Sequence, residues 1–423
     1  MGGGLLQLVA YGAQDVYLTG NPQITFFKVV YRRHTNFAVE SIAQTLNGTA
    51  AYGNTVYSTI SRNGDLINRA YMEFKIPKLT DYKFDFHTNA ALEYATARYV
   101  NYLGLKLLSQ VTIEIGGQQI DKHYSDWMYI WNELSLPLGK RSGYEMMVGA
   151  DGDVTSGSDT DTVLHVPLEF WFCRNVGLAL PLIALQYHEV KLKIVFEEKA
   201  NCIHTEARGG ATEPDPNVSF GAQLWVDYIF LDTDERRRFA QLSHEYLIEQ
   251  LQFTGSEDLK ASDGNRYRLN FNHPCKELVW VAKQSDKDWY NYTDGGLKTA
   301  ALSAENDVTN LTDAIYPAGK NPLTNCLLQL NGNDRFAARD GGYFNYVQPY
   351  QHHTNIPTNR GINVYSFALK PEEHQPSGTL NMSRIDTAVL SMKSSEAGSI
   401  HIYALNYNVL RIMSGMGGLA YSN

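Results

Sequence analysis

The stretch Val111-Thr-Ile-Glu-Ile-Gly-Gly-Gln-Gln-Ile120 decides the fold class, because it joins an alternating segment to a two-glycine turn. Apolar and polar residues alternate up to Ile115, which is typical of a strand with one buried face. Gly116-Gly117 then tolerates the positive φ angles that a two-residue hairpin turn requires, and the alternation resumes beyond it. We therefore predict a β-hairpin here.

The same kind of pattern recurs along the chain. Leu327-Leu-Gln-Leu330 followed by Asn331-Gly332 is a second strong hairpin signal. Lys191-Leu-Lys-Ile-Val-Phe196 begins as an alternating strand and ends apolar, and Trp225-Val-Asp-Tyr-Ile-Phe-Leu231 has the composition of a strand buried along most of its length. Many short strands separated by Gly, Asn and Asp turns predict an all-β sandwich or barrel.

Two segments favour helices instead. Ser125 is placed to cap a helix whose apolar residues share one face. These apolar residues are Trp127, Ile130, Trp131 and Leu134. Asp232 with Glu235 three residues later resembles a capping box and predicts a short helix that ends near Ala240. Because another strand is expected over residues 247–253, we interpret the second helix as a linker between two β-domains.

The two halves of the chain echo one another. Three segments of the first half match three of the second in pattern, and the matches follow the same order. The matched pairs are residues 113–117 with 328–332, residues 185–190 with 380–385, and residues 225–230 with 405–410. Two copies of one β-domain would explain the echo, although alternating strands also resemble one another by chance.

Composition excludes several classes of protein. Hydrophobic residues make up 43% and charged residues 19%, so a sizeable core is expected and disorder is not. The net charge is −9, and Arg236-Arg237-Arg238 directly follows three acidic residues, which argues against direct nucleic-acid binding. The four cysteines lie far apart, so we expect free thiols rather than a zinc site or disulfide framework. The N-terminus lacks signal-peptide features, which predicts a soluble protein made in the cytosol.

Long polar segments separate some of the expected strands. They cover residues 149–161, 197–217 and approximately 283–325. Loops of this length in a compact domain are usually functional or mobile. In a shell-forming protein they would project outward or contact neighbours.

Several motifs resemble the major capsid proteins of nucleocytoplasmic large DNA viruses, most of all those of the algal chlorovirus and phycodnavirus type. The resemblance begins with Gln7-Leu-Val-Ala-Tyr-Gly-Ala-Gln-Asp-Val-Tyr-Leu-Thr-Gly-Asn-Pro-Gln-Ile-Thr-Phe-Phe-Lys28 and samples the whole chain. The further segments are residues 61–66, 116–124, 178–190, 226–233, 330–336, 365–369, 375–378 and 408–421. The long polar segments match least.

This resemblance implies a double jelly roll, in which two eight-stranded antiparallel β-sandwiches stand side by side with short helices and long loop insertions. The division that follows is an N-terminal arm over residues 1–26, a first jelly roll over 27–232, a helical linker over 233–243, and a second jelly roll with its tail over 244–423. The family implies a homotrimeric, pseudo-hexagonal capsomer that tiles an icosahedral shell. The arm would lie at the inner face of that shell.

Candidate reactive sites are few. We expect no catalytic, cofactor-binding or metal residues: His188-Glu189 and His244-Glu245 lack the second His of HExxH, and His352-His353 is interpreted as a pair of polar loop residues. Five Asn-x-Ser/Thr sequons occur. Because the algal members of the family resemble glycoproteins, we predict possible N-glycosylation at Asn291, Asn310 and Asn217. The sequons at Asn47 and Asn381 adjoin expected core strands and are discounted.

The expected function is therefore that of a late structural protein of the virion rather than an enzyme. Expected partners are two further copies, neighbouring capsomers, and minor capsid and penton proteins. The inner membrane would be reached only through minor proteins. Synthesis and assembly are expected in the host cytoplasm. Two alternatives stay open: a carbohydrate-binding attachment protein, since jelly rolls also serve lectins, and a jelly-roll hydrolase.

Overall fold

The computed structural model describes residues 13, 21, 34–79, 94–150, 161–208, 218–262, 264–284, 290–294 and 319–421. The arm expected over residues 1–26 thus lies outside the described residues, apart from positions 13 and 21. Residues 38–423 form one compact unit.

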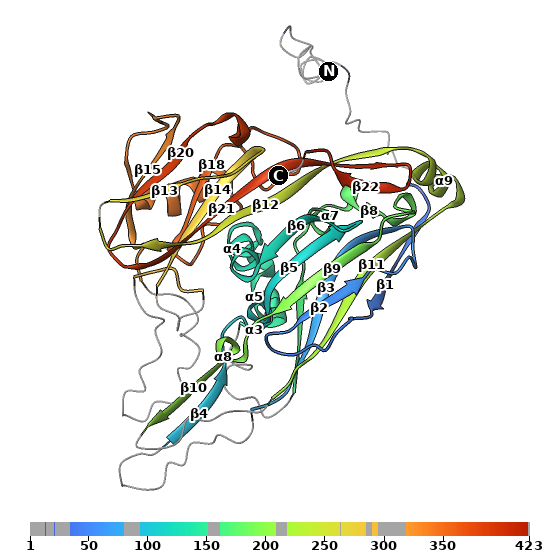
Figure 1. The fold of residues 1–423 in the computed structure, drawn as a ribbon, viewed down its shortest axis with the longest axis horizontal. Helices are drawn as coiled ribbons and strands as arrows, with labels where there is room; N and C mark the ends of the chain where they lie inside the picture. The colour runs from blue at the N-terminus through green and yellow to red at the C-terminus, as the bar shows by residue number, and fades with distance from the viewer. Residues whose placement is uncertain are drawn as a thin grey trace, which may run out of the picture. The chain divides into compact units, whose positions relative to one another are not determined.

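The first half of the chain folds into two antiparallel sheets (Figure 1). The β3 sheet has the strand order β1-β11-β3-β7, and the short β8 also pairs with β3; the β5 sheet has the order β2-β9-β5-β6. These eight principal strands form one sandwich in jelly-roll order. They are β1 (Phe37–Gln44), β2 (Thr55–Thr59), β3 (Leu66–Ile76), β5 (Leu108–Ile115), β6 (Gln118–Tyr124), β7 (Thr162–Pro167), β9 (Val190–Phe196) and β11 (Gly221–Leu231), and the additional short strand is β8 (Leu180–Pro181).

The second half repeats this arrangement. The β14 sheet has the order β12-β21-β14-β18, with β19 on β14 and β22 on β21, and the β15 sheet has the order β13-β20-β15-β16, with β17 on β15. The strands are β12 (His244–Leu259), β13 (Asn265–Arg268), β14 (Pro274–Lys283), β15 (Leu323–Leu330), β16 (Asn333–Asp334), β17 (Arg339–Asp340), β18 (Ile362–Ser366), β19 (Leu380–Asn381), β20 (Ala388–Ser394), β21 (Gly398–Met413) and β22 (Met416–Leu419).

The two sandwiches correspond strand for strand. Replacing β1, β11, β3 and β7 by β12, β21, β14 and β18 converts one sheet order into the other, and the second pair of sheets corresponds in the same way. The predicted double jelly roll is therefore confirmed, and the echo in the sequence is structural. One of the three sequence matches is out of register. Residues 380–385 were matched with residues 185–190, but in the structure β19 and its 3₁₀ turn, residues 380–384, correspond to β8 and its turn, residues 180–184.

Both predicted hairpin turns form where the sequence places them. Gly116 and Gly117 have φ angles of 60° and 82°, and Asn331 and Gly332 have φ angles of 50° and 79°. Two consecutive positive φ angles are typical of a type I′ turn, whose twist matches that of the strands it joins. The turn residues therefore fix the register of β5 with β6 and of β15 with β16.

Short helices connect the strands. They are α3 (Leu103–Leu107), α4 (Ser125–Ser135), α5 (Leu138–Val148), α7 (Trp171–Arg174), α8 (Lys199–Cys202), α9 (Thr233–Gln241) and α10 (Gln348–His352), with the 3₁₀ turns η1 (Val176–Leu178), η2 (Leu182–Ala184) and η5 (Met382–Arg384) and the π-helical η4 (Tyr343–Val347). None of the helices in the described ranges is long and apolar enough to cross a membrane.

The two predicted helices form, with one difference in capping. Asp232 Oδ1 accepts a hydrogen bond of 2.9 Å from the Glu235 backbone N–H, as the capping-box pattern predicts for α9. Ser125 instead is the first residue of α4, and its hydroxyl donates to the Leu105 carbonyl oxygen at 3.0 Å. The prediction that Ser125 caps α4 was wrong, because a tertiary acceptor competes for its hydroxyl.

One expected polar loop contains regular structure. Residues 197–217 were predicted as an insertion, but α8 and β10 (Ile203–Arg208) occupy its first part. Among the residues that the structure describes, β10 pairs with β4 (Tyr94–Tyr99) alone, and the two form a two-stranded ribbon apart from the four large sheets. Most of the other two insertions, residues 149–161 and 283–325, lies outside the described residues.

Corresponding strands differ in how they are buried. In β3 the residues facing the sandwich core are buried and the outward ones are partly or fully exposed. In β14 nearly every residue is buried, on both faces of the sheet. The outward face of the β14 sheet must therefore be covered by another part of the molecule, and the first sandwich provides that cover.

Candidate functional site: the interface between the two sandwiches

One hydrophobic core runs through the first sandwich and continues into the second. The inward residues of the β14 sheet belong to a separate core within the second sandwich. The outward residues of the same sheet join the core of the first sandwich; they include Ile248, Leu251, Val279, Val281, Val364, Tyr403 and Leu405. Each large apolar side chain buried in this way contributes about 1.5–3 kcal/mol, so the two sandwiches form a permanent unit.

Helix α4 supplies the central apolar contact of this interface. Trp127 is 1% exposed, and its ring centroid lies 5.5 Å from that of Tyr403 on β21. Trp131, one turn later, lies 5.8 Å from Trp127, and the guanidinium carbon of Arg174 is 4.7 Å from its ring centroid. The helical spacing predicted from sequence thus brings the two indoles onto one buried face of α4, where Trp127 meets Tyr403 of the second sandwich.

An ion pair fixes the start of α4. Asp126 Oδ2 lies 2.8 Å from Lys283 Nζ of β14, and the Tyr292 hydroxyl donates to Asp126 Oδ1 at 3.0 Å. Burial disfavours the Asp126 carboxylate, but Lys283 outweighs burial, so the pKa of Asp126 is lowered. Burial and then Lys283 lower the pKa of nearby His401 to about 4, although Asp126 opposes them, so His401 is neutral at pH 7.

A second ionic cluster joins α7 to the second sandwich. Glu249 accepts from Lys276 Nζ at 2.8 Å through Oε1, and its Oε2 lies 3.1 Å from Arg174. The Lys276 side chain is fully buried, with Nζ 4.9 Å from the Tyr407 ring centroid. Burial disfavours the Glu249 charge, but Arg174, His374 with its Nδ1 3.9 Å from Glu249 Oε1, and Lys276 together lower the pKa of Glu249 to about 2. Removing one partner of such a buried pair typically costs about 3–5 kcal/mol.

Asp121 links the two sandwiches through the backbone. Its Oδ1 accepts hydrogen bonds from the backbone N–H groups of Leu251 at 3.0 Å and of Lys122 at 2.8 Å. Its Oδ2 lies 3.0 Å from Nε2 of His123, a buried ring that stacks on Phe170 with centroids 4.6 Å apart. Because Leu251 lies on β12, this carboxylate orders the first strand of the second sandwich against β6.

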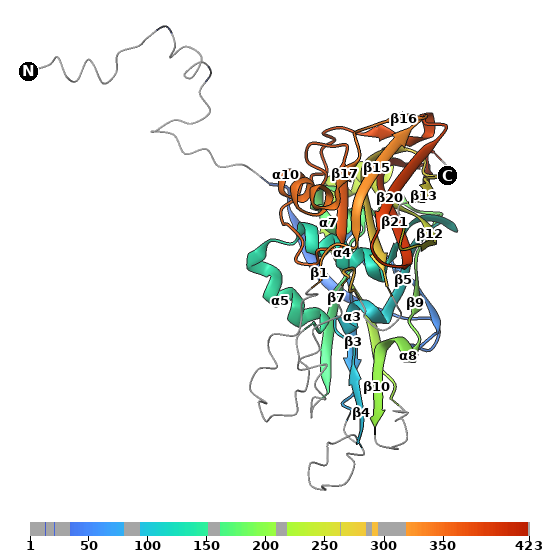
Figure 2. The same cartoon turned by 90° about the vertical axis from the view of Figure 1, so that its left-hand side faces the viewer.

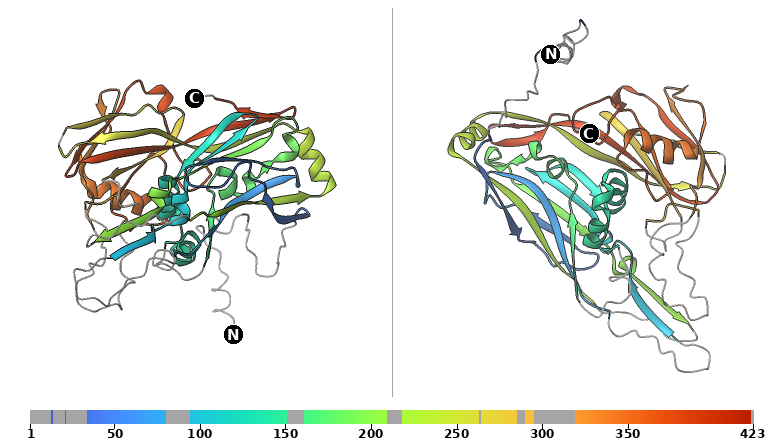
Figure 3. Two further views of the ribbon diagram at one scale, coloured as in Figure 1. Left: turned by 60° about the horizontal axis from the view of Figure 1, so that its bottom comes forward. Right: turned by 180° about the vertical axis from the view of Figure 1, so that it is seen from behind.

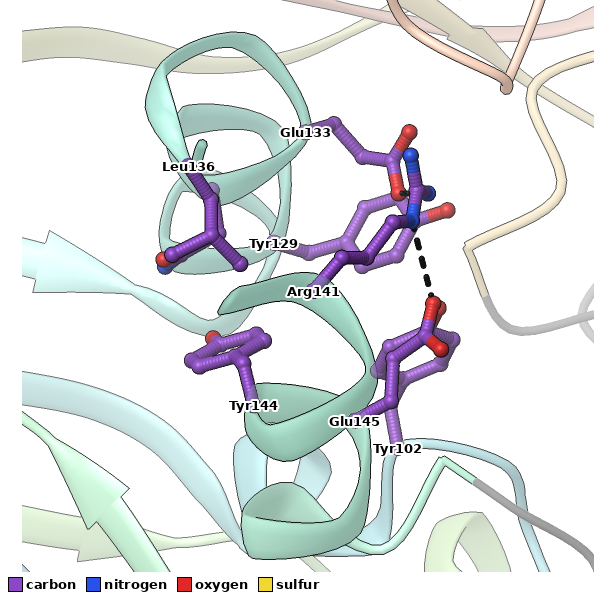
Figure 4. A pocket seen from close by; sticks show the side chains of 8 residues that line it. Tyr102, Tyr129, Glu133, Leu136, Arg141, Tyr144 and Glu145 are labelled. Carbon is purple, nitrogen blue, oxygen red and sulfur yellow. Dashed lines mark hydrogen bonds and ion pairs between the residues drawn. The ribbon is translucent and has the colours of Figure 1, made fainter. Parts of the chain in front are cut away.

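A loop of the second sandwich, residues 355–358, forms hydrogen bonds with the junction of α4 and α5. Arg141 forms ion pairs with Glu133 and, at 3.1 Å, with Glu145 inside the pocket shown in Figure 4. The Thr358 hydroxyl and backbone N–H donate to Glu133 Oε2 at 2.8 and 3.1 Å. The Asn355 side chain donates to the Leu136 carbonyl oxygen. These contacts fasten residues 355–358 to the first sandwich.

His353 is a buried ion-pair partner rather than the polar loop residue that the sequence predicts. Its Nε2 lies 2.9 Å from Glu277 Oε2, and its Nδ1 lies 2.9 Å from Glu372 Oε1. Burial alone would lower the pKa of His353, but the charge of Glu277 at 2.9 Å and the hydrogen bond with Glu372 outweigh it and raise the pKa of His353 to about 9. The ring is therefore protonated at pH 7, and it connects β14 with the segment after β18.

The predicted glycosylation sequons fall in different places. Asn310 and Asn217 lie outside the described residues. Asn291 was predicted to lie on an exposed insertion, but it is 8% exposed, and its Oδ1 accepts from the N–H and the hydroxyl of Thr293 at 3.1 and 2.8 Å. The expectation of an accessible amide at Asn291 was therefore wrong, since polar composition does not distinguish a surface loop from a segment folded into the interface.

The ionic residues of the interface could not be predicted from the sequence. Arg174, Glu249 and Lys276 belong to three elements that are distant along the chain, so no local spacing brings them together. The interface itself does leave one signal: Leu278-Val-Trp-Val-Ala282 is continuously apolar instead of alternating, which indicates a strand covered on both faces. Across the ranges that the structure describes, no group of three His, Cys, Asp or Glu side chains could hold a metal ion.

Comparison with known families supports a structural role. A family described as "Major capsid protein N-terminus" matches residues 25–232, and one described as "Large eukaryotic DNA virus major capsid protein" matches residues 235–418. The chain is 50% identical to the major capsid protein of Pyramimonas orientalis virus over 450 residues, with 100% of both chains covered. It is 47% identical to that of Paramecium bursaria Chlorella virus 1 over 463 residues, again with 100% of both covered.

Solved structures agree with these matches. A chain of the quasi-atomic model of the PBCV-1 virus capsid is 40% identical, with a TM-score of 0.78 and coverage of 94% of this chain and 100% of that one. The Faustovirus major capsid protein is 14% identical, with a TM-score of 0.71 and coverage of 97% and 96%, and supports the fold alone. The chain therefore belongs to the family of major capsid proteins of large eukaryotic DNA viruses.

Proposed function

We propose that three copies of this chain form a capsomer of pseudo-hexagonal outline that tiles the icosahedral shell of a large double-stranded DNA virus. The observation that carries the proposal is the repeat: two sandwiches of the same strand order are fixed to one another by a continuous core. Three chains of two similar sandwiches place six similar units around one axis, which suits close packing on a flat face. Closed ring symmetry is the usual solution for such homo-oligomers.

The role we propose is mechanical rather than enzymatic. Contacts within and between capsomers would resist internal pressure and exclude nucleases. The proposed partners are neighbouring capsomers, minor capsid proteins and penton proteins, with the internal membrane reached only through minor proteins. The net charge of −9 favours no direct contact with nucleic acid. We place the protein in the virion, after synthesis and assembly in the host cytoplasm.

We also propose the division of the chain given by the family resemblance. The first jelly roll covers residues 27–232, the linker 233–243 and the second jelly roll with its tail 244–423, after an arm over residues 1–26. Support comes from α9, which lies between the last strand of the first sandwich and the first strand of the second. Asn310 and Asn217 remain proposed glycan acceptors; intact-mass and glycopeptide spectrometry of protein from virions tests them.

Electron microscopy of the purified protein tests the capsomer. The proposal predicts single particles with a six-lobed outline and three-fold symmetry, because the two sandwiches of a chain are similar but not identical. Particles with a two-lobed outline and no rotational symmetry would contradict it. A fusion partner on α9, whose described residues include no buried side chain, would mark one lobe in every two and so distinguish three chains from six.

A further inference from the structure

The outward faces of the two corresponding sheets differ in what covers them. The outward face of the β14 sheet is covered by the first sandwich, with α4 at the centre of the contact. The outward face of the β3 sheet carries Tyr71, Trp225, His165 and Val163 together with the polar side chains of Arg69, Glu73, Lys75 and Gln223. Tyr71 stacks on Trp225 with centroids 6.4 Å apart and meets His165 edge-on at 6.1 Å, and Val163 is 46% exposed. This half-open aromatic face corresponds to one that is closed in the second sandwich.

The helical segments of the two sandwiches also occupy corresponding places, but their apolar side chains are buried to different extents. α4 follows the β5–β6 hairpin and precedes β7, while η4 and α10 follow the β15–β16 hairpin and precede β18. All of the large apolar side chains of α4 are buried. Around η4 and α10, by contrast, five apolar side chains are 39–76% exposed; we call them the η4–α10 surface, and they are Tyr346, Val347, Tyr350, Ile356 and Leu369.

The η4–α10 surface gathers exposed apolar side chains from neighbouring segments of the second sandwich. Tyr346 and Val347 end η4, Tyr350 lies in α10, and His352 of α10 is 3.0 Å from the Leu369 carbonyl oxygen. Figure 2 shows α10 at the margin of the second sandwich, and the right panel of Figure 3 shows the same orange helical segment on the face of that sandwich that is seen from behind. On a scale of about 150–250 Å² for a whole aromatic side chain, Tyr346 and Tyr350 at 42% and 76% exposure present about 180–300 Å² together. The three aliphatic side chains add to this area, and a standard interface buries about 800 Å² on each partner, of which roughly 60% is apolar.

We propose that the η4–α10 surface packs on the outward face of the β3 sheet of the next copy of the chain. This inference rests on the proposed trimer and names its contact. Within one chain, α4 of the first sandwich covers the outward face of the β14 sheet of the second sandwich. Between chains, η4 and α10 of the second sandwich would cover the β3 sheet in the first sandwich of the neighbouring chain. The same contact between a helical segment and a sheet face then repeats around the ring, alternately within one chain and between two chains.

The partner that binds the η4–α10 surface is a second copy of the chain, because the equivalents of the two proposed surfaces already pack against each other within one chain. A ring requires a heterologous contact, in which one patch meets a different patch of the neighbour. The η4–α10 surface and the β3 sheet face are two such patches, and their equivalents α4 and the β14 sheet already meet in the same chain. The exposed tyrosines also have the composition of an interface core.

Two single variants and their mixture test the contact by light scattering after size fractionation. Tyr350→Glu places a charge on the η4–α10 surface, and Val163→Glu places one on the β3 sheet face. We expect each variant alone to have the chain mass of 47.6 kDa, while the wild type has about three times that mass. Tyr187→Glu is the matched control: it changes a side chain that is 75% exposed elsewhere, and it should leave the trimer intact.

The mixture of the two variants tests whether these two patches meet each other. Each variant keeps one intact patch, so one contact can form between unlike chains, and we expect a species of about twice the chain mass of 47.6 kDa. Trimeric single variants, or a mixture without the dimer, would overturn the inference. A monomeric wild type would overturn the proposed trimer and the inference with it. Far-UV circular dichroism checks folding, with Leu369→Glu and Lys75→Glu as a second pair if one variant misfolds.

Discussion

At the scale of single residues, His353 is the most informative group of the interface, because it is a cation held between two carboxylates away from water. Its pKa of about 9 in the folded protein lies above the ordinary value of 6.5. The folded state therefore binds a proton more tightly than the unfolded state does. The stabilisation is complete below about pH 6.5 and is lost as the pH rises through 9.

We predict that the free energy of unfolding falls between pH 7 and pH 9.5 and that His353→Gln removes most of this dependence. The variant should also be less stable at pH 7 by about 3–5 kcal/mol, since it leaves Glu277 buried without its partner. Denaturant titrations across this pH range measure both effects. His352→Gln, which changes the adjacent and more exposed ring, is the control. An alkaline profile that is the same in His353→Gln and in the wild type would contradict this account.

Prediction from sequence at the residue scale succeeded only where the cause is local. The shared face of Trp127 and Trp131 follows from helical spacing, so their burial could be predicted. The burial of His353 and Asn291 depends on strands far away in the chain, and polar composition indicated a surface loop for both. The pairing of Arg174 with Glu249 had no local signal at all.

At the scale of elements, the β5–β6 turn tests whether glycine is required for conformation or for space. Both Gly116 and Gly117 have positive φ angles, but an added Cβ on Gly116 would lie 2.3 Å from His188 Nδ1, whereas one on Gly117 would meet nothing within 4 Å. We predict that Gly117→Ala costs about 1–2 kcal/mol through backbone strain alone. Gly116→Ala should cost about 1–3 kcal/mol more because His188 must move.

Chemical denaturation of the two alanine variants measures this difference. His188→Ala combined with Gly116→Ala provides the control, because removal of the ring should bring the cost of the second change close to that of Gly117→Ala. Equal costs for the two single glycine variants would show that the turn is limited by conformation only.

Elements with strong periodicity could be predicted from sequence, and elements that depend on distant pairing could not. The hairpins around Gly116-Gly117 and Asn331-Gly332 form where alternation and turn residues coincide. The ribbon of β4 and β10 was missed, because its strands pair with no other strand of the described residues and because β10 lies in a polar segment. The predicted capping of α4 by Ser125 was wrong, since the Ser125 hydroxyl donates to the Leu105 carbonyl oxygen in α3.

At the scale of the whole molecule, the shared core predicts that the two sandwiches unfold together. Residues of both belong to one continuous hydrophobic cluster, and buried ion pairs cross the same interface. We expect one calorimetric transition in which both sandwiches unfold together, rather than one transition for each sandwich. Trp127→Ala, which removes the central contact with Tyr403, should lower the transition temperature of the whole molecule. Two separate transitions in the wild type would contradict the shared core.

The sequence predicts the two β-sandwiches better than it predicts how they pack against each other. Alternating strands, two hairpin signals and the echo between the halves indicate two β-sandwiches from the residues alone. The side-by-side packing of the sandwiches was implied only by family resemblance. The continuously apolar run at residues 278–282 is its one trace in the sequence, because a strand that is covered on both faces loses its alternation.

The mass of the purified wild-type protein in solution tests the central claim most directly. Light scattering on a size-fractionated sample gives this mass without assumptions about shape. The capsomer account predicts a stable species of about 143 kDa, three times the chain mass of 47.6 kDa. A species that stays at 47.6 kDa at every accessible concentration would contradict it.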